Sequence, residues 1–383
     1  MSTIKIYDTT LRDGSQSEGI SFSVEDKLRI ATKLDSFGID FIEGGWPGAN
    51  PKEDEFFAQA KKRLKLKKSK LVAFGSTRRV GGVPGKDPVL KGLLNADTRY
   101  ITIFGKAWDL HVKSVLKTTL VENLRMIGDS ITFLKKRGKK VIFDAEHFFD
   151  GYSDNPEYAL KTLKVAIDSG AETAVLCDTN GGAVTSSIFE TVEEIKEKFN
   201  YSLGIHTHND GEMAVANSIA AVQAGCDQVQ GTINGYGERC GNANLISIIP
   251  ALRLKLGYDC LSDFAIAEMT EVSRYVAEIA NMRHSDAQPY AGKSAFAHKA
   301  GVHINAIMKK SRTYEHVVPE KVGNKRRLLV SELSGKSTVI KKAENVGLKL
   351  DKTSPATKTI LEKVQDLEKE GYQFELAEAS LML

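Results

Sequence analysis

Two histidines separated by one residue, His206 and His208, end a short apolar run and are the first candidates for chemistry. Residues i and i+2 of a strand point to the same face, so both imidazoles can reach one ion. Asp13 is the natural carboxylate ligand to join them, and Asn242 can add an amide oxygen, although each alone is also typical of a turn or cap residue. This pattern predicts a divalent metal site, and the ligand types do not choose among Mg2+, Mn2+ and Zn2+.

Four further polar residues could act beside a metal that polarises a carbonyl. Arg12 would place a fixed cation where negative charge grows in an enolate-forming or aldol-type transition state, and the alternative is a simple salt bridge to its neighbour. Glu146 is a candidate acid-base group or substrate contact, and Thr179 can donate to a carboxylate. Glu238, in a glycine-rich loop, is a further catalytic candidate.

These residues follow short apolar runs that alternate with amphipathic segments, which is typical of a parallel sheet built from βα units. Eight such units over roughly 250 residues predict a closed (β/α)8 TIM barrel, whose active site lies at the carboxyl ends of its strands. The expected strands are 4–8, 40–44, 70–74, 100–104, 140–145, 173–177, 203–207 and 228–232.

Local signals support the helices between these strands. Ser23 begins a capping box, Gly38 ends the same helix, and Asn155-Pro156 offers an N-cap followed by proline at the first helical position. An open doubly wound sheet is the competing architecture. Its dinucleotide form requires GxGxxG after the first strand, where this chain has Leu11-Arg12-Asp13-Gly14.

The βα rhythm stops after residue 257. We therefore predict a catalytic barrel over 1–257 and a helical accessory region over 258–383, which ends with a charged helix around 359–370.

Composition excludes several classes of protein. A chain of 383 residues with 42% hydrophobic and 27% charged residues is ordinary for a globular protein. No apolar run approaches the roughly 20 residues of a membrane helix, and a net charge of +4 is too mild to predict nucleic-acid binding. Four scattered cysteines form no CxxC pair, and the N-terminus lacks a signal-peptide layout, so we expect a cytoplasmic protein with reduced thiols.

The chain resembles the family of 2-isopropylmalate, homocitrate and citramalate synthases, to which the lyase that cleaves hydroxymethylglutaryl-CoA is related. The resemblance spans nearly the whole length and rests on three motifs in order: Asp8-Thr9-Thr10-Leu11-Arg12-Asp13-Gly14, His206-Thr207-His208-Asn209-Asp210 and Gly235-Tyr236-Gly237-Glu238-Arg239-Cys240-Gly241-Asn242. The third motif looks like the synthases. The lyase carries its cysteine in a different loop, so Cys240 is not expected to be catalytic. Segments 43–48, 104–111 and 144–151 look closest to the citramalate-forming members.

The resemblance implies an acyltransferase that condenses acetyl-CoA with pyruvate in a Claisen-type reaction and hydrolyses the thioester, giving citramalate and CoA. By this analogy the metal, held by Asp13, His206 and His208 with Asn242, chelates the 2-oxo acid. Arg12 would stabilise the developing oxyanions, Glu146 would contact substrate and Thr179 would bind its carboxylate.

The same resemblance assigns the base that deprotonates the acetyl methyl group to a histidine of the accessory region of a neighbouring subunit. His303 matches best, with Asn305 and Tyr314 as companions near the acyl-CoA, and His298 is the alternative. A shared site implies a homodimer. Many relatives continue into a C-terminal regulatory domain, which we expect to be absent from a chain that stops at Leu383. A role in isoleucine biosynthesis follows if pyruvate is the substrate.

Three other functions remain open from the sequence. A 2-isopropylmalate or homocitrate synthase would use a larger 2-oxo acid and differ only in a pocket whose wall candidates are Phe104 and Asp144. A metal-dependent hydrolase on the same barrel, or a non-catalytic binding barrel, is more remote.

Overall fold

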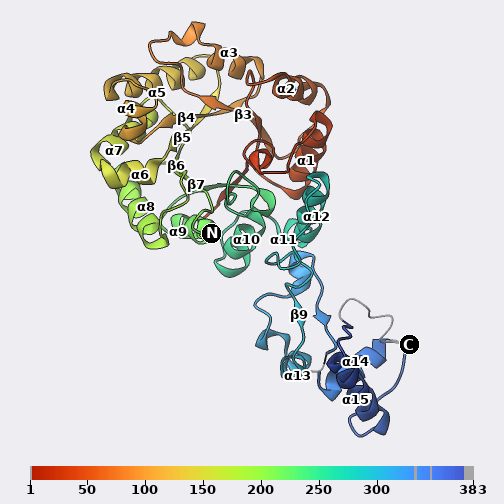
Figure 1. Ribbon diagram of the computed structural model, residues 1–383. Helices are drawn as coiled ribbons and strands as arrows, with labels where there is room; N and C mark the ends of the chain where they lie inside the picture. The colour runs from red at the N-terminus through yellow and green to blue at the C-terminus, as the bar shows by residue number, and fades with distance from the viewer. Residues whose placement is uncertain (1, 332–333, 346, 375–383) are drawn as a thin grey trace. The chain divides into compact units, whose positions relative to one another are not determined.

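The computed structural model describes residues 2–331, 334–345 and 347–374. They form two compact units that divide between Arg283 and His284, each with its own internal packing. Figure 1 shows the first unit as a ring of strands enclosed by helices.

All eight expected strands are present and close into one parallel barrel in sequence order, which confirms the predicted TIM barrel. Closure is made by β1 pairing with both β2 and β8. The strands are β1 (Lys5–Asp8), β2 (Phe41–Gly45), β3 (Lys70–Ser76), β4 (Tyr100–Lys106), β5 (Lys140–Glu146), β6 (Thr173–Asp178), β7 (Leu203–Thr207) and β8 (Gln228–Gly231).

The predicted helix signals act as expected. The Ser23 side chain accepts from the Asp26 N–H in a reciprocal capping box, and Gly38 ends the helix at φ 101°, which glycine adopts without strain. Asn155 caps the helix that begins at Pro156. The barrel unit contains α1 (Val24–Phe37), α2 (Pro51–Arg63), α3 (Pro88–Asn95), α4 (Asp109–Ser114), α5 (Leu120–Lys135), α6 (Phe148–Asp154), α7 (Pro156–Asp168), α8 (Thr185–Phe199), α9 (Ala214–Gln223), α10 (Leu245–Pro250), α11 (Asp263–Ala267) and α12 (Met269–Ile279).

The inside of the barrel is apolar at one level and polar toward the carboxyl ends of the strands. An apolar cluster of inward-facing side chains fills it: Tyr7, Phe41, Val72, Ile142, Val175 and Cys177. Because side chains alternate along a strand, the residues two positions further on face the same interior. Among them are Glu43 and Asp144, which are fully or almost fully buried, so this part of the barrel depends on polar contacts.

The boundary between the units differs from the one that the sequence suggested. The end of the βα rhythm placed it after residue 257, whereas α11 and α12 pack against α1 and belong to the barrel unit. The apolar face of α12, with Met269, Val272 and Val276 buried, supplies the physical reason.

The second unit is mainly helical, as expected, and also holds a short two-stranded parallel sheet that local patterns did not reveal. Its elements are β9 (Ala297–His298), α13 (Gly301–Lys309), β10 (Arg327–Leu328), α14 (Lys336–Asn345) and α15 (Pro355–Lys369). The last helix contains the predicted charged segment.

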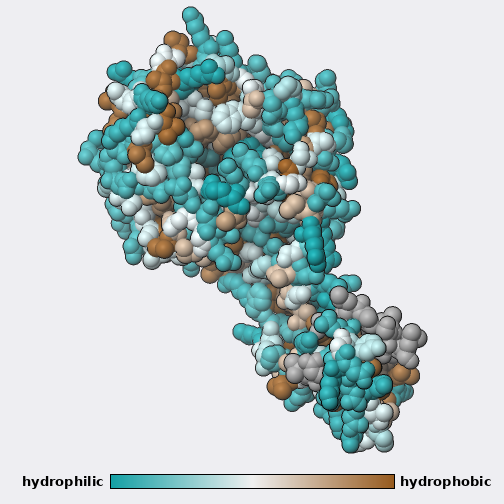
Figure 2. All heavy atoms as spheres, viewed as in Figure 1, coloured by the Kyte–Doolittle hydropathy of each residue, from teal (hydrophilic) through white to brown (hydrophobic). Residues whose placement is uncertain are grey.

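The surface of the barrel unit is mainly hydrophilic on the face shown in Figure 2. Hydrophobic side chains gather at one edge, over the loop before α3 and around α4, where Val83, Leu110 and Val115 are exposed. Among the described residues, no helix combines the length and apolar character needed to cross a membrane.

Candidate active site

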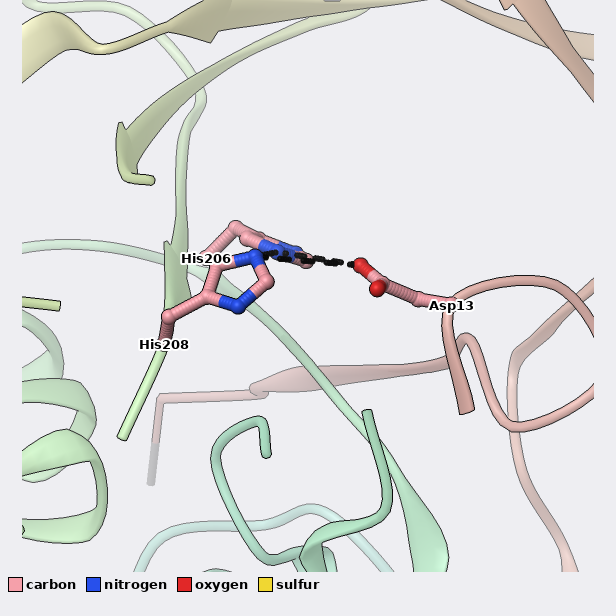
Figure 3. A group of neighbouring side chains, drawn as sticks. All are labelled: Asp13, His206 and His208. Carbon is pink, nitrogen blue, oxygen red and sulfur yellow. Dashed lines mark hydrogen bonds and ion pairs between the residues drawn. The ribbon is translucent and has the colours of Figure 1, made fainter. Parts of the chain in front are cut away.

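The three predicted acidic and imidazole ligands meet at the carboxyl end of the barrel. Figure 3 shows His206 and His208 projecting from the end of β7 toward Asp13, which follows β1. The two Nε2 atoms are 3.3 Å apart, and they lie 3.4 Å and 4.0 Å from Asp13 Oδ2. All three side chains are buried, and each turns one ligand atom toward a common point.

The protonation states of this group suit a cation. Burial lowers the pKa of His206 to about 3 and also lowers that of His208, so both imidazoles are neutral near pH 7 and keep a lone pair. Burial alone would raise the pKa of Asp13, but the Arg12 guanidinium and the two imidazoles outweigh it and lower that pKa. A neutral imidazole pair with one carboxylate is a usual donor set for a divalent metal.

Asn242 completes the fit. Its backbone pairs with that of His208, and its side chain hydrogen-bonds Asp13. The buried Oδ1 atom of Asn242 has no hydrogen-bond partner among the described residues. An unpaired buried acceptor is costly, and a cation held by the neighbouring ligands would satisfy it.

Arg12 is held in place by a buried network. Its Nε donates to Glu43 Oε1 at 2.6 Å, its Nη1 lies 3.2 Å from Asp13 Oδ2, and its guanidinium stacks 3.8 Å above the ring of Phe74. Tyr7 fixes the other Glu43 oxygen by donating at 2.6 Å. A guanidinium has five N–H donors, so these contacts leave others for substrate oxygens.

The turn that presents Arg12 and Asp13 depends on Asp8. Its Oδ1 accepts from the Thr10 backbone N–H at 2.9 Å, and its Oδ2 accepts from the Thr10 hydroxyl at 2.8 Å. Burial raises the pKa of Asp8 to about 7, although the two hydrogen bonds from Thr10 act to lower it.

Asp8 therefore predicts a pH effect on stability. Its pKa is higher in the folded than in the unfolded state, so the stabilisation that it contributes is full below about pH 4 and is lost as pH rises through about 7. We expect the stability advantage of native protein over Asp8→Asn to shrink by up to ~4 kcal/mol across that window. Urea unfolding of both proteins at several pH values measures it, and parallel profiles would contradict it.

A cavity of ≈ 220 Å³ opens beside the triad. It is lined by Arg12, Asp13, Gln16, Trp46, Phe74, Phe104, Asp144, Glu146, Cys177, Thr179, His206, His208, Glu238 and Arg239. Three of its aromatic rings interlock, because Trp46 meets Phe74 and Phe104 edge-on while those two stack at 5.5 Å. The cavity thus combines a cluster of packed aromatic rings with charged groups, and the Arg12 guanidinium lies directly on the Phe74 ring.

The structure brings the other barrel candidates to this cavity. Glu146 is ion-paired with Lys106. Thr179 Oγ1 accepts from the His147 backbone N–H at 2.9 Å, which leaves the hydroxyl hydrogen for a substrate acceptor. Glu238 lines the rim with its side chain 61% exposed.

The candidates from the accessory region lie in the second unit. His303 is exposed and stacks on Tyr314 with ring centroids 4.2 Å apart, and Asn305 is on the same helix, α13. The alternative, His298, is held by Glu315 at 3.3 Å, and Arg326 binds that carboxylate through two nitrogens. His303 is thus the more accessible of the two, and its assignment stays a prediction.

Several residues of the site were not singled out by the sequence. Trp46 and Phe74 line the cavity, while Glu43 and Tyr7 hold Arg12. Glu43 and Phe74 stand near strand ends, which is a signal that could have identified them. Gln230 lies one residue before the end of β8, so the same signal could have identified it.

Comparison with known families supports the architecture of both units. The HMGL-like family model matches residues 3–276, and a model described as homocitrate synthase post-HMGL domain-like matches residues 291–371. The first match covers the barrel, and the second falls within the helical unit.

Curated relatives are similar along nearly the whole chain. The (R)-citramalate synthase of Aquifex aeolicus is 56% identical over 99% of this chain and 72% of its own length, and that of Geobacter sulfurreducens is 55% identical over 100% and 72%. The 2-isopropylmalate synthase of Sulfolobus acidocaldarius is 34% identical over 98% of this chain and 94% of its own.

Solved structures share the fold at low sequence identity. The hydroxymethylglutaryl-CoA lyase of Pseudomonas aeruginosa gives a TM-score of 0.63 at 16% identity, covering 76% of this chain and 97% of that one. The HMG-CoA lyase of Bacillus subtilis gives 0.62 at 18%, covering 74% and 95%.

Proposed function

The chain belongs to the HMGL-like family, and we propose that it is an acyltransferase that condenses acetyl-CoA with pyruvate to form citramalate. The observation that carries this proposal is the 47–56% identity to five curated (R)-citramalate synthases over 99–100% of the chain. Three 2-isopropylmalate synthases reach 34%, so the alternative with a larger 2-oxo acid has less support.

We infer a divalent metal at Asp13, His206 and His208, with Asn242 beside it. Such an ion would supply Lewis-acid polarisation of the keto group of pyruvate. The unpaired Asn242 Oδ1 and the neutral imidazoles support this assignment. These donors are compatible with Mg2+, Mn2+ or Zn2+.

The remaining residues would bind the substrate and balance its charge. Arg12, fixed by Glu43, would donate to the keto oxygen as it gains negative charge. Thr179 would donate to the carboxylate of pyruvate. Glu146 and Glu238 would contact substrate or move protons at the cavity.

The reaction forms a carbon–carbon bond between the acetyl methyl carbon and the keto carbon of pyruvate. A base takes the methyl proton, the keto oxygen becomes a hydroxyl, and water then cleaves the thioester to release CoA. We propose that His303 of a second copy is the base, with Asn305 and Tyr314 near the acyl-CoA, in a cytoplasmic homodimer of isoleucine biosynthesis. The exposure of His303 on α13 supports this role.

Acetyl-CoA-dependent thiol release tests the proposed function. The assay uses pyruvate, 2-oxobutyrate, 2-oxoisovalerate and 2-oxoglutarate, each with and without a divalent ion. We expect metal-dependent release that is fastest with pyruvate. Preference for 2-oxoisovalerate or 2-oxoglutarate would instead indicate a 2-isopropylmalate or homocitrate synthase. No thiol release with any of the acids would contradict the condensation.

The cluster of packed aromatic rings in the cavity predicts a change of specificity. Phe104→Ala would remove one of the three interlocked rings and open the cavity beside the substrate. We expect the ratio of kcat/KM for 2-oxoisovalerate over pyruvate to rise by about 10- to 100-fold, since one buried methylene changes binding by ~1–3 kcal/mol. Phe133→Ala, on α5 outside the cavity lining, is the matched control and should leave the ratio unchanged.

A further inference from the structure

A chain of buried hydrogen bonds inside the barrel links His206 on β7 to Gln230 on β8 and Asp144 on β5. Gln230 is paired in register with His206 on the neighbouring strand, and its Oε1 lies 3.0 Å from His206 Nδ1. The Nε2 of the same amide donates to Asp144 Oδ1 on β5 at 3.1 Å. Gln230 is fully buried, and Asp144 and His206 are 4% and 5% exposed, so water does not compete with these bonds.

The direction of these bonds determines which nitrogen of His206 carries its proton. The carboxyl Oδ1 of Asp144 accepts, so it selects the NH2 end of the Gln230 amide. The carbonyl end then faces His206 Nδ1, and a carbonyl oxygen only accepts. His206 must therefore carry its hydrogen on Nδ1, which leaves a lone pair on Nε2.

The Nε2 atom is the one that faces the other ligands, at 3.4 Å from Asp13 and 3.3 Å from His208. Burial, with Glu43 nearby, raises the pKa of Asp144 well above its usual range. When that proton lies on Oδ2, Oδ1 is still an acceptor, and the order of the bonds is the same as for the carboxylate.

His208 provides the contrast. Its Nδ1 is buried and has no hydrogen-bond partner among the described residues. The two imidazoles of the triad thus differ, because the Nδ1 atom of His206 has a protein partner whereas that of His208 has none among the described residues.

We propose that Gln230, held by Asp144, is a positioning residue that keeps His206 in the tautomer whose Nε2 can bind the metal. This inference rests on the proposed metal site. Partners of this kind orient metal-binding histidines and typically change metal affinity by ~10–100-fold when removed.

The proposal is tested by calorimetric titration of metal-free protein with Mn2+ in the absence of substrates. Gln230→Leu should raise the Kd for Mn2+ by ~10–100-fold. The matched control is Gln228→Leu, on the same strand and face, because the amide of Gln228 is also fully buried but makes no hydrogen bond within the described residues. The control should keep the native Kd, and an equal loss in both variants, or no loss in either, would overturn the proposal.

Two further measurements separate this role from a merely structural one. Gln230→Glu keeps an acceptor for His206 Nδ1, so it should bind Mn2+ more tightly than Gln230→Leu, and equal affinities would contradict the proposal. Nitrogen-15 spectra of histidine-labelled, metal-free native protein should show His206 protonated on Nδ1, with the signal assigned by its loss in His206→Ala. Protonation on Nε2 would overturn the proposal even if the leucine variant did not fold.

These results can be distinguished from failure of the proposed function. If native protein bound no Mn2+, the metal site itself would be wrong. If native protein bound Mn2+ and Gln230→Leu bound it equally well, only the positioning role would be wrong.

Discussion

His206→Ala is expected to lower kcat for the condensation by about three orders of magnitude, since a bound metal contributes several kcal/mol to a transition state of this type. The variant removes one of three buried ligand atoms that converge on a common point. Asp13 and His208 alone would hold the ion weakly, so the Kd for Mn2+ should rise as well. Thiol release at saturating substrates and Mn2+ calorimetry measure the two effects.

The control for His206→Ala is another histidine of the barrel. His111, on α4, stacks on Trp108 and lies outside the triad, so His111→Ala should bind Mn2+ with native affinity. Near-native turnover of His206→Ala, or full activity of native protein after treatment with a chelator, would contradict the metal assignment.

Mixing two inactive variants is expected to restore activity if the site is shared between subunits. Asp13→Ala lacks a metal ligand, and His303→Ala lacks the proposed base. In a mixed dimer, one site combines the intact Asp13 of one subunit with the intact His303 of the other. Random assortment would then recover roughly a quarter of native turnover, because half of the dimers are mixed and each holds one complete site.

Co-expression of the two variants with different affinity tags allows mixed dimers to be isolated and assayed. Each variant expressed alone is the control and should be inactive. Mixed dimers without activity would show that each site is built within one chain, whereas activity of His303→Ala alone would remove His303 as the base and favour His298.

The sequence by itself determined the barrel and the three residues of the candidate metal site. Short apolar runs and local caps such as the Ser23 capping box are properties of neighbouring residues, so the eight strands could be located from the order of residues alone. The spacing of His206 and His208 placed both rings on one face of a strand, and the strand-end rule of the barrel added Asp13.

Only the tertiary structure decided how these ligands are supported. Closure of the barrel between β1 and β8 brings Asp13 to the histidines, and the contacts that hold Arg12 and His206 join residues of different strands. Gln230 and Asp144 lie on β8 and β5, and their hydrogen bond forms only when these strands take their places in the barrel. The end of the barrel unit was equally non-local, since α12 belongs to it through packing on α1.

The physical reason is the range of the interactions. Strand formation and helix capping depend on residues within a few positions, which a single sequence displays. The hydrogen bonds across the barrel depend on strand register and closure, which set distances between residues far apart in the chain. Local spacing thus displays the candidate metal-site residues, whereas the contacts of His206 with Gln230 and of Arg12 with Glu43 form only when the barrel closes.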